Sequence, residues 1–198
     1  EPELVITKGR ANLATYNSWI TYHKDLSTNH HLYLNTTDNQ QNGIGDYFRD
    51  AAFSNTVIGL GNDIYGPNVN NTTMIAYCFH SVDGFSKIGS YTGNGTDPGP
   101  FVYTGFKPAF VMLKRTDSTG NWWVFDNARN NSNSLNKGIR VNLSNTEEDT
   151  DADANTYEYV INFFSNGFQY RIDDNTSAHP DYNANNGTYI YMAFAEDP

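Results

Sequence analysis

The most chemically specific feature of the sequence is the acidic run Glu-Glu-Asp-Thr-Asp-Ala-Asp at residues 147–153. Within it, Asp149, Asp151 and Asp153 have the alternate spacing with which carboxylates surround a hard cation such as Ca²⁺. A calcium loop of the EF-hand type would continue with Gly, and Ala154 stands there instead. The pattern therefore favours a solvated loop, with a calcium site as the alternative, and the sequence indicates no other cofactor.

Aromatic side chains offer a second kind of chemistry, because sugar rings stack on Trp and Tyr while amides and carboxylates bind sugar hydroxyls. Trp122 and Trp123 are neighbours in an apolar run, so a strand directs them to opposite faces. Trp122 matches Trp19 in an internal repeat, which makes Trp122 the expected core residue. Trp123 then packs under a loop or lies exposed on the outer face, where it would contact carbohydrate.

Polar groups just past this strand complete the candidate site. Asp126 and Arg129 would either orient a polar ligand or pair with each other, and Tyr103 lies in another short strand between Phe and Thr neighbours. The candidate ligand-binding residues are therefore Trp123, Asp126, Arg129 and Tyr103.

Recognisable catalytic motifs do not occur in the sequence. It has no Gly-x-Ser-x-Gly elbow, no His-Glu-x-x-His, no phosphate-binding loop and no Gly-x-Gly-x-x-Gly. The adjacent pair His30 and His31 would point to opposite faces of a strand, which disfavours a metal role. We expect a protein that is not an enzyme, with a polysaccharide depolymerase as the least favoured alternative.

The composition indicates which elements must position these residues. The chain has 198 residues, of which 15% are aromatic and only 17% charged, and it is rich in Asn and Gly. These residue types suit half-buried strands and tight turns rather than helices. We predict an all-β fold with strands at 18–23, 31–35, 53–60, 72–80, 85–91, 101–104, 109–115, 121–126, 139–143, 157–164, 167–172 and 187–195.

The charge balance restricts the partners. Twelve basic residues stand against 22 acidic ones, a formal charge of −10. A nucleic-acid partner needs a basic footprint and an anionic membrane surface attracts positive charge, so we expect neither nucleic-acid binding nor membrane insertion. Cys78, in the apolar run that ends at Phe79, is predicted to be a small core residue.

An internal duplication runs along the chain. Five segments recur in the same order at offsets that drift only from 103 to 115. The pairs are 2–8 with 108–114, 17–23 with 121–126, 34–36 with 141–144, 53–55 with 164–166, and 70–79 with 185–194. We therefore predict two tandem antiparallel β-sandwich modules of jelly-roll type, at residues 1–83 and 84–198.

The segment from Gly84 to Phe106, which opens the second copy, has no counterpart in front of the first. The first module has then lost its opening strand or takes one from elsewhere, because an uncovered sheet edge promotes aggregation. This gap leads us to expect that the chain is a piece of a longer repeat array.

The motifs of both copies resemble an uncharacterised tandem β-domain of marine tailed-phage structural proteins, which often lies beside laminin-G/concanavalin-like modules in tail-fibre-type proteins. The matching segments are Gly84–Gly95, Pro100–Val111, Lys114–Ser118, Phe164–Phe168, Thr188–Glu196, Trp19–Leu26 and Leu34–Thr37. The resemblance implies a location on the virion surface and brings no catalytic residues.

Together these expectations describe a tail-fibre or similar appendage module that contributes to host-surface glycan binding and assembly. The alternative is a purely structural decoration or cement protein of the capsid or tail. The implied partners are other virion structural proteins and a host glycan, and analogy with phage fibres suggests a homo-oligomer.

Overall fold

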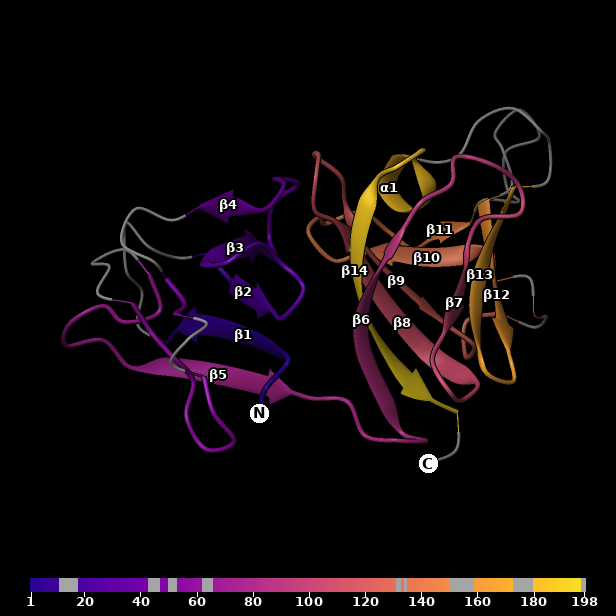
Figure 1. Cartoon of the computed structure of the whole chain (residues 1–198). Helices are drawn as coiled ribbons and strands as arrows, with labels where there is room; N and C mark the ends of the chain where they lie inside the picture. The colour runs from indigo at the N-terminus through magenta and orange to yellow at the C-terminus, as the bar shows by residue number, and fades with distance from the viewer. Residues whose placement is uncertain are drawn as a thin grey trace. The chain divides into compact units, whose positions relative to one another are not determined.

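The computed structural model describes residues 1–10, 18–42, 47–49, 53–61, 66–130, 133, 135–149, 159–172 and 180–196. Over these residues the chain is all-β, with three antiparallel sheets and one helical turn. Its contacts divide it into two compact units, Glu1–His80 (unit 1) and Ser81–Pro198 (unit 2). The sequence predicted a boundary after residue 83, and the two units are described separately below (Figure 1).

Unit 1 contains one five-stranded sheet among its described residues. The strands are β1 (Leu4–Gly9), β2 (Ile20–His23), β3 (His30–Tyr33), β4 (Gln41–Asn42) and β5 (Met74–Phe79). Their order in the sheet is β4-β3-β2-β1-β5, and every neighbouring pair is antiparallel. One face is covered by Phe48 and Phe53, which pack with Val5, Ile20 and Tyr22 in a small core.

Unit 2 contains two sheets and a helical turn. Its elements are β6 (Ser86–Thr92), β7 (Phe101–Tyr103), β8 (Pro108–Arg115), β9 (Trp122–Asp126), β10 (Lys137–Arg140), β11 (Glu148–Asp149), β12 (Tyr159–Phe164), β13 (Gly167–Ile172), α1 (Pro180–Asn183) and β14 (Thr188–Ala195). The large sheet has the order β11-β10-β9-β8-β14-β6, and the small sheet has the order β12-β13-β7.

The two sheets of unit 2 share one core and so form a sandwich. Alternation along each strand sends every second side chain inward. The small sheet contributes residues such as Ile161 and Phe168, and the large sheet contributes residues such as Leu113, Phe125 and Tyr191. The sandwich architecture predicted from the sequence therefore describes unit 2.

The five-stranded sheet of unit 1 has the same strand order as five strands of unit 2. Strands β1 to β5 correspond in order to β8, β9, β10, β11 and β14. The registers correspond as well, at the positions that the sequence repeat pairs. The matching pairs are Leu4↔His23 with Phe110↔Asp126, Val5↔Tyr22 with Val111↔Phe125, Val5↔Cys78 with Val111↔Ala193, and Lys8↔Ile75 with Lys114↔Ile190. This shared register supports the inferred duplication.

Several expectations about unit 1 were wrong. Residues 53–60 form no strand; Leu60 alone makes an isolated bridge, to Phe48. Unit 1 holds a single sheet over the residues that the structure describes, so a second sheet in this module stays a prediction. Cys78 is exposed, because β5 is an edge strand whose middle residues are not covered. No helix in the described ranges is long and apolar enough to cross a membrane.

Candidate functional site

The outer face of the small sheet carries three exposed aromatic rings, which we call the Tyr103 patch: Phe101, Tyr103 and Phe164. Tyr103 is 65% exposed, Phe101 45% and Phe164 37%. They share a face because Phe164 and Tyr103 both lie opposite Gly167 on β13. The rings of Phe101 and Phe164 meet edge to face, with centroids 5.8 Å apart. An exposed aromatic cluster of this kind can receive a flat apolar ligand surface.

Gly167 lets β7 lie close to β13 beneath this patch. A Cβ atom at Gly167 would clash with the carbonyl oxygen of Val102 and would come within 2.7 Å of the Phe101 ring. Any side chain at Gly167 would displace the β7 backbone, because a carbonyl oxygen cannot move independently of its strand. Gly167 therefore positions Phe101.

Amide and charged groups border the rings. Gln169 lies opposite Phe101 in the sheet, and its Nε2 donates to the carbonyl oxygen of Gly99 at 2.9 Å. Arg171, two residues further along β13, pairs with Asp97, with Nε and Oδ1 3.2 Å apart. Aromatic faces bordered by amides and a guanidinium are typical of surfaces that bind sugars.

Trp123 does not belong to this surface, and the expectation that it lies on an outer face was wrong. It is 3% exposed and packs in the sandwich core, stacked on Phe125 at 5.7 Å between ring centroids. Its Nε1 donates to Oδ2 of Asp181 at 2.9 Å, and the Arg140 guanidinium lies over its ring at 4.9 Å. A sugar cannot reach this ring, so Trp123 is structural.

Asp126 and Arg129 pair with each other, which was one of the two expected roles. The Asp126 carboxylate accepts from the Nε of Arg129 and also from the backbone N–H groups of Ala128 and Arg129. Arg129 also reaches Glu147 at 3.0 Å. These bonds raise the pKa of the Arg129 guanidinium, chiefly through Asp126 and then through Glu147. The two residues close a turn and are not part of the Tyr103 patch.

The predicted calcium loop lies mostly outside the described residues. Asp151 and Asp153 are not described, and Asp149 is described only as a strand residue of β11. Over the part of the chain that the structure describes, no group of three or more His, Cys, Asp or Glu side chains gathers as metal ligands would. The calcium site stays a prediction.

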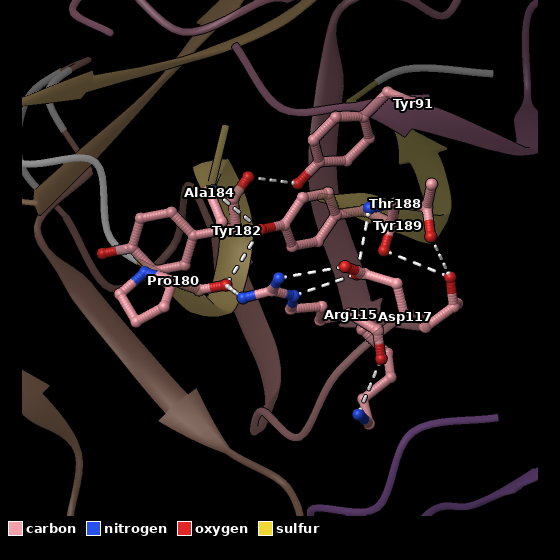
Figure 2. Close-up of polar contacts among 10 residues, drawn as sticks. Tyr91, Arg115, Asp117, Pro180, Tyr182, Ala184, Thr188 and Tyr189 are labelled. Atoms are coloured by element: carbon pink, nitrogen blue, oxygen red, sulfur yellow. Dashed lines mark hydrogen bonds and ion pairs between the residues drawn. The ribbon is translucent and has the colours of Figure 1, made fainter. Parts of the chain in front are cut away.

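A dense polar network joins α1 to the large sheet (Figure 2). Arg115 donates to both carboxylate oxygens of Asp117, at 2.9 and 3.0 Å, and its Nη1 donates to the carbonyl oxygen of Pro180 at 3.2 Å. The Asp117 carboxylate also accepts from the backbone N–H of Thr188 at 3.0 Å. The Arg115 hydrogen bond lowers the pKa of Asp117, and the network holds the α1 turn on the sheet.

Buried and partly buried tyrosines complete the attachment of α1 (Figure 2). The Tyr91 hydroxyl donates to the Tyr182 carbonyl oxygen, and the Tyr189 hydroxyl donates to the Pro180 carbonyl oxygen, both at 2.8 Å. The Tyr91 and Tyr189 rings stack 4.9 Å apart. Burial raises the pKa of Tyr189 to about 12 and that of Tyr91 well above its usual value. These phenols stay protonated at neutral pH, so they act as structural hydrogen-bond donors.

The sequence analysis identified Tyr103 and missed its neighbours Phe101 and Phe164. The available signal was alternation: in the strand Phe101-Val102-Tyr103 the buried Val102 separates two aromatic residues, which must then share the opposite face. Phe164 ends one strand of the hairpin whose turn is Ser165-Asn166, and only the pairing of that hairpin with β7 brings it to the patch.

The fold and the patch together define an antiparallel β-protein with an exposed aromatic surface. The chain belongs to the family described as Domain of unknown function (DUF7483), which matches residues 1–198. Comparisons with curated proteins and with solved structures gave no significant match.

Proposed function

We propose that the chain is a non-enzymatic surface module of a tailed-phage virion, of the tail-fibre type, that contributes to host-surface glycan binding and to assembly. The phage origin comes from the motif resemblance described above. The binding role is supported by one observation: three aromatic rings, Phe101, Tyr103 and Phe164, lie exposed on one face.

The Tyr103 patch fits a sugar better than it fits a charged ligand. Its rings offer apolar faces for the C–H groups of a sugar ring, and Gln169 and Arg171 at its border offer groups that bind hydroxyls. The formal charge of −10 disfavours a polyanionic partner such as nucleic acid.

The experiment is a glycan array with the purified chain, followed by titration of the best ligand. We expect Tyr103→Ala to weaken the best ligand at least tenfold, which corresponds to about 1.4 kcal/mol. Tyr77→Ala is the matched control, because Tyr77 is an exposed tyrosine in unit 1, outside the patch. A folded chain that binds no glycan and no host cell would contradict the proposal.

A structural decoration or cement protein of the capsid or tail is the second candidate function. One observation favours it: β5 is a sheet edge with no partner strand beyond it among the described residues, and such edges join protein subunits. Labelling intact particles with an antibody against this chain distinguishes the two. Label at the tail tip supports the fibre role, and label over the head shell supports the decoration role.

A further inference from the structure

The free edge of β5 presents a defined set of backbone groups. The N–H of Glu3 donates to the carbonyl oxygen of Phe79, and the N–H of Arg10 donates to the carbonyl oxygen of Thr73. The backbone carbonyls of Phe79 and Thr73 therefore point toward β1. Because backbone groups alternate in direction along an antiparallel strand, Met74, Ala76 and Cys78 direct theirs away from β1. Within the described ranges no strand receives these three N–H and three C=O groups.

The equivalent strand of unit 2 shows what covers such an edge. β14 pairs with β8 in the register in which β5 pairs with β1. The other edge of β14 is paired by β6 over seven positions, from Thr188↔Thr92 to Phe194↔Ser86. The geometry of this sheet therefore accommodates one more antiparallel strand at the position that no described strand takes in unit 1.

Burial along the two strands also differs. In β14 the residues Tyr191, Met192 and Ala193 are buried. Their equivalents in β5, which are Ala76, Tyr77 and Cys78, are exposed. An apolar strand with an open edge is a position at which proteins add a strand from a partner.

Side-chain size indicates what the added strand carries. Across the β14–β6 pair the large Tyr191 lies opposite Gly89, where a Cβ would come within 2.9 Å of the Tyr191 hydroxyl. In unit 1 the position of Tyr191 is held by Ala76, which leaves room for a larger neighbour. The matching strand therefore has a bulky apolar residue opposite Ala76.

We propose that β5 binds an extended segment donated by another polypeptide chain, which pairs antiparallel with β5 as β6 pairs with β14 and places a bulky apolar side chain opposite Ala76. The backbone groups of Met74, Ala76 and Cys78 exchange six hydrogen bonds with this segment. The proposal adds an assembly surface on unit 1 and does not depend on glycan binding by unit 2.

A second copy of this chain is a poorer occupant. Antiparallel pairing of β5 with itself about Ala76 satisfies the same backbone groups, but it sets Ala76 against Ala76. Two alanine side chains would leave empty the space that a bulky residue would fill. Atoms that line such a void lose packing contacts.

The test uses the full chain and a synthetic 12-residue peptide with the sequence of Gly84–Gly95, made with Gly89→Leu and labelled for fluorescence anisotropy. We expect saturable binding that is at least tenfold weaker for the chain variant Ala76→Pro. The N–H of Ala76 points away from β1, so proline removes a donor only at the free edge. Ala76→Ser, which keeps the N–H and the small size, is the matched control and should bind as the unsubstituted chain does.

A second arm needs no chain variant. N-methylation of the peptide at position 89, which faces β5, should abolish binding, whereas N-methylation at position 88, which faces away, should leave it intact. The unmodified Gly89 peptide should bind more weakly than the leucine peptide.

Three results would overturn the proposal. One is a folded chain that binds neither peptide. Another is that the Ala76→Pro variant binds the peptide as tightly as the unsubstituted chain does. The peptide would then bind at another place, for example beside β14 in place of β6. The last is a peptide-free dimer that Ala76→Pro dissociates, since a second copy would then be the occupant.

Discussion

Units 1 and 2 carry the same five-stranded sheet, with the same strand order and the same register, but they bury it differently. In unit 2 the strand β6 covers the open edge and the β12-β13-β7 sheet covers one face. In unit 1 the described residues provide neither, and Phe48 and Phe53 from the chain between β4 and β5 cover the face instead.

The difference traces to one segment of the sequence. Both β6 and β7 lie between residues 86 and 103, in the segment that opens the second copy. One segment therefore completes both sheets of the sandwich, by adding a strand to each. Among its described residues, unit 1 has no strand at either of these positions.

The largest expected effect concerns the core of unit 2. Trp123→Ala should lower the free energy of unfolding by about 3–5 kcal/mol, because it leaves a cavity in the sandwich and removes the hydrogen bond to Asp181. Urea unfolding followed by circular dichroism measures this. The residue at the equivalent position of unit 1 is Ile20, which is buried without such a link to a helical turn.

Trp123→Phe is the control for the hydrogen bond alone. It keeps an aromatic ring beside Phe125 but removes the indole N–H that donates to Asp181. Asp181 still accepts a hydrogen bond from Asn121. We expect a loss of about 1–3 kcal/mol. A variant as stable as the unsubstituted chain would show that the link to α1 contributes nothing.

The second prediction concerns His31, a buried histidine of unit 1. His31 is 1% exposed and packs against the Tyr47 ring at 4.3 Å between centroids, and neither ring nitrogen has a hydrogen-bond partner among the described residues. Burial, and secondly the neighbouring His30, lower the pKa of His31 to about 4. The equivalent residue in unit 2 is Gly138, by the pairing of β10 with β9.

Because the pKa of His31 in the folded chain lies below the unfolded value of about 6.5, its contribution to stability is complete above pH 6.5. As the pH falls from 6.5 to 4, the unfolded chain takes up the proton first, and up to about 3 kcal/mol is lost. His31→Phe should therefore reduce the difference between the unfolding free energies at pH 7 and pH 4.5. The exposed His80→Asn is the control, and an unchanged difference in His31→Phe would refute the assignment.

Alternation and the internal repeat predicted most strands and the shared sheet, because both depend on local pattern. The faces were harder to predict. β9 reads Trp-Trp-Val-Phe and is apolar on both faces, so the pattern alone does not say that Trp123 faces the sandwich core. The match of Trp122 with Trp19 was correct in register, and Trp122 is buried as expected, but Trp123 is buried as well, in the core of the sandwich.

Cys78 shows a second limit of sequence analysis. The segments Met74–Phe79 and Tyr189–Phe194 are both apolar, yet the first is largely exposed and the second buried. The residues themselves do not decide this difference. What covers the strand decides it: in unit 2, Tyr191 and Ala193 pack in the core shared with the small sheet, and β6 pairs with the edge of β14.

The smallest predicted effect uses a pair of equivalent turn positions. The repeat that matches Phe53-Ser54-Asn55 with Phe164-Ser165-Asn166 also matches Thr56 with Gly167. Gly167→Thr should cost about 1–3 kcal/mol, because its Cβ would displace the Val102 carbonyl and with it β7. The reciprocal Thr56→Gly should cost no more than about 1 kcal/mol, since Thr56 is exposed and β7 has no counterpart beside it in the described part of unit 1.

Urea unfolding measures both changes, and hydrogen exchange at the amides of Phe101 and Tyr103 reports on β7 directly. Faster exchange at these amides in Gly167→Thr alone would show that glycine is needed at this turn only where an opening strand lies against it. If Gly167→Thr costs no more than Thr56→Gly, the contact with the Val102 carbonyl does not require glycine at position 167, and the difference between the two positions would then not depend on β7. The glycan titration adds a further readout, because a displaced Phe101 should weaken binding at the Tyr103 patch even when the unit stays folded.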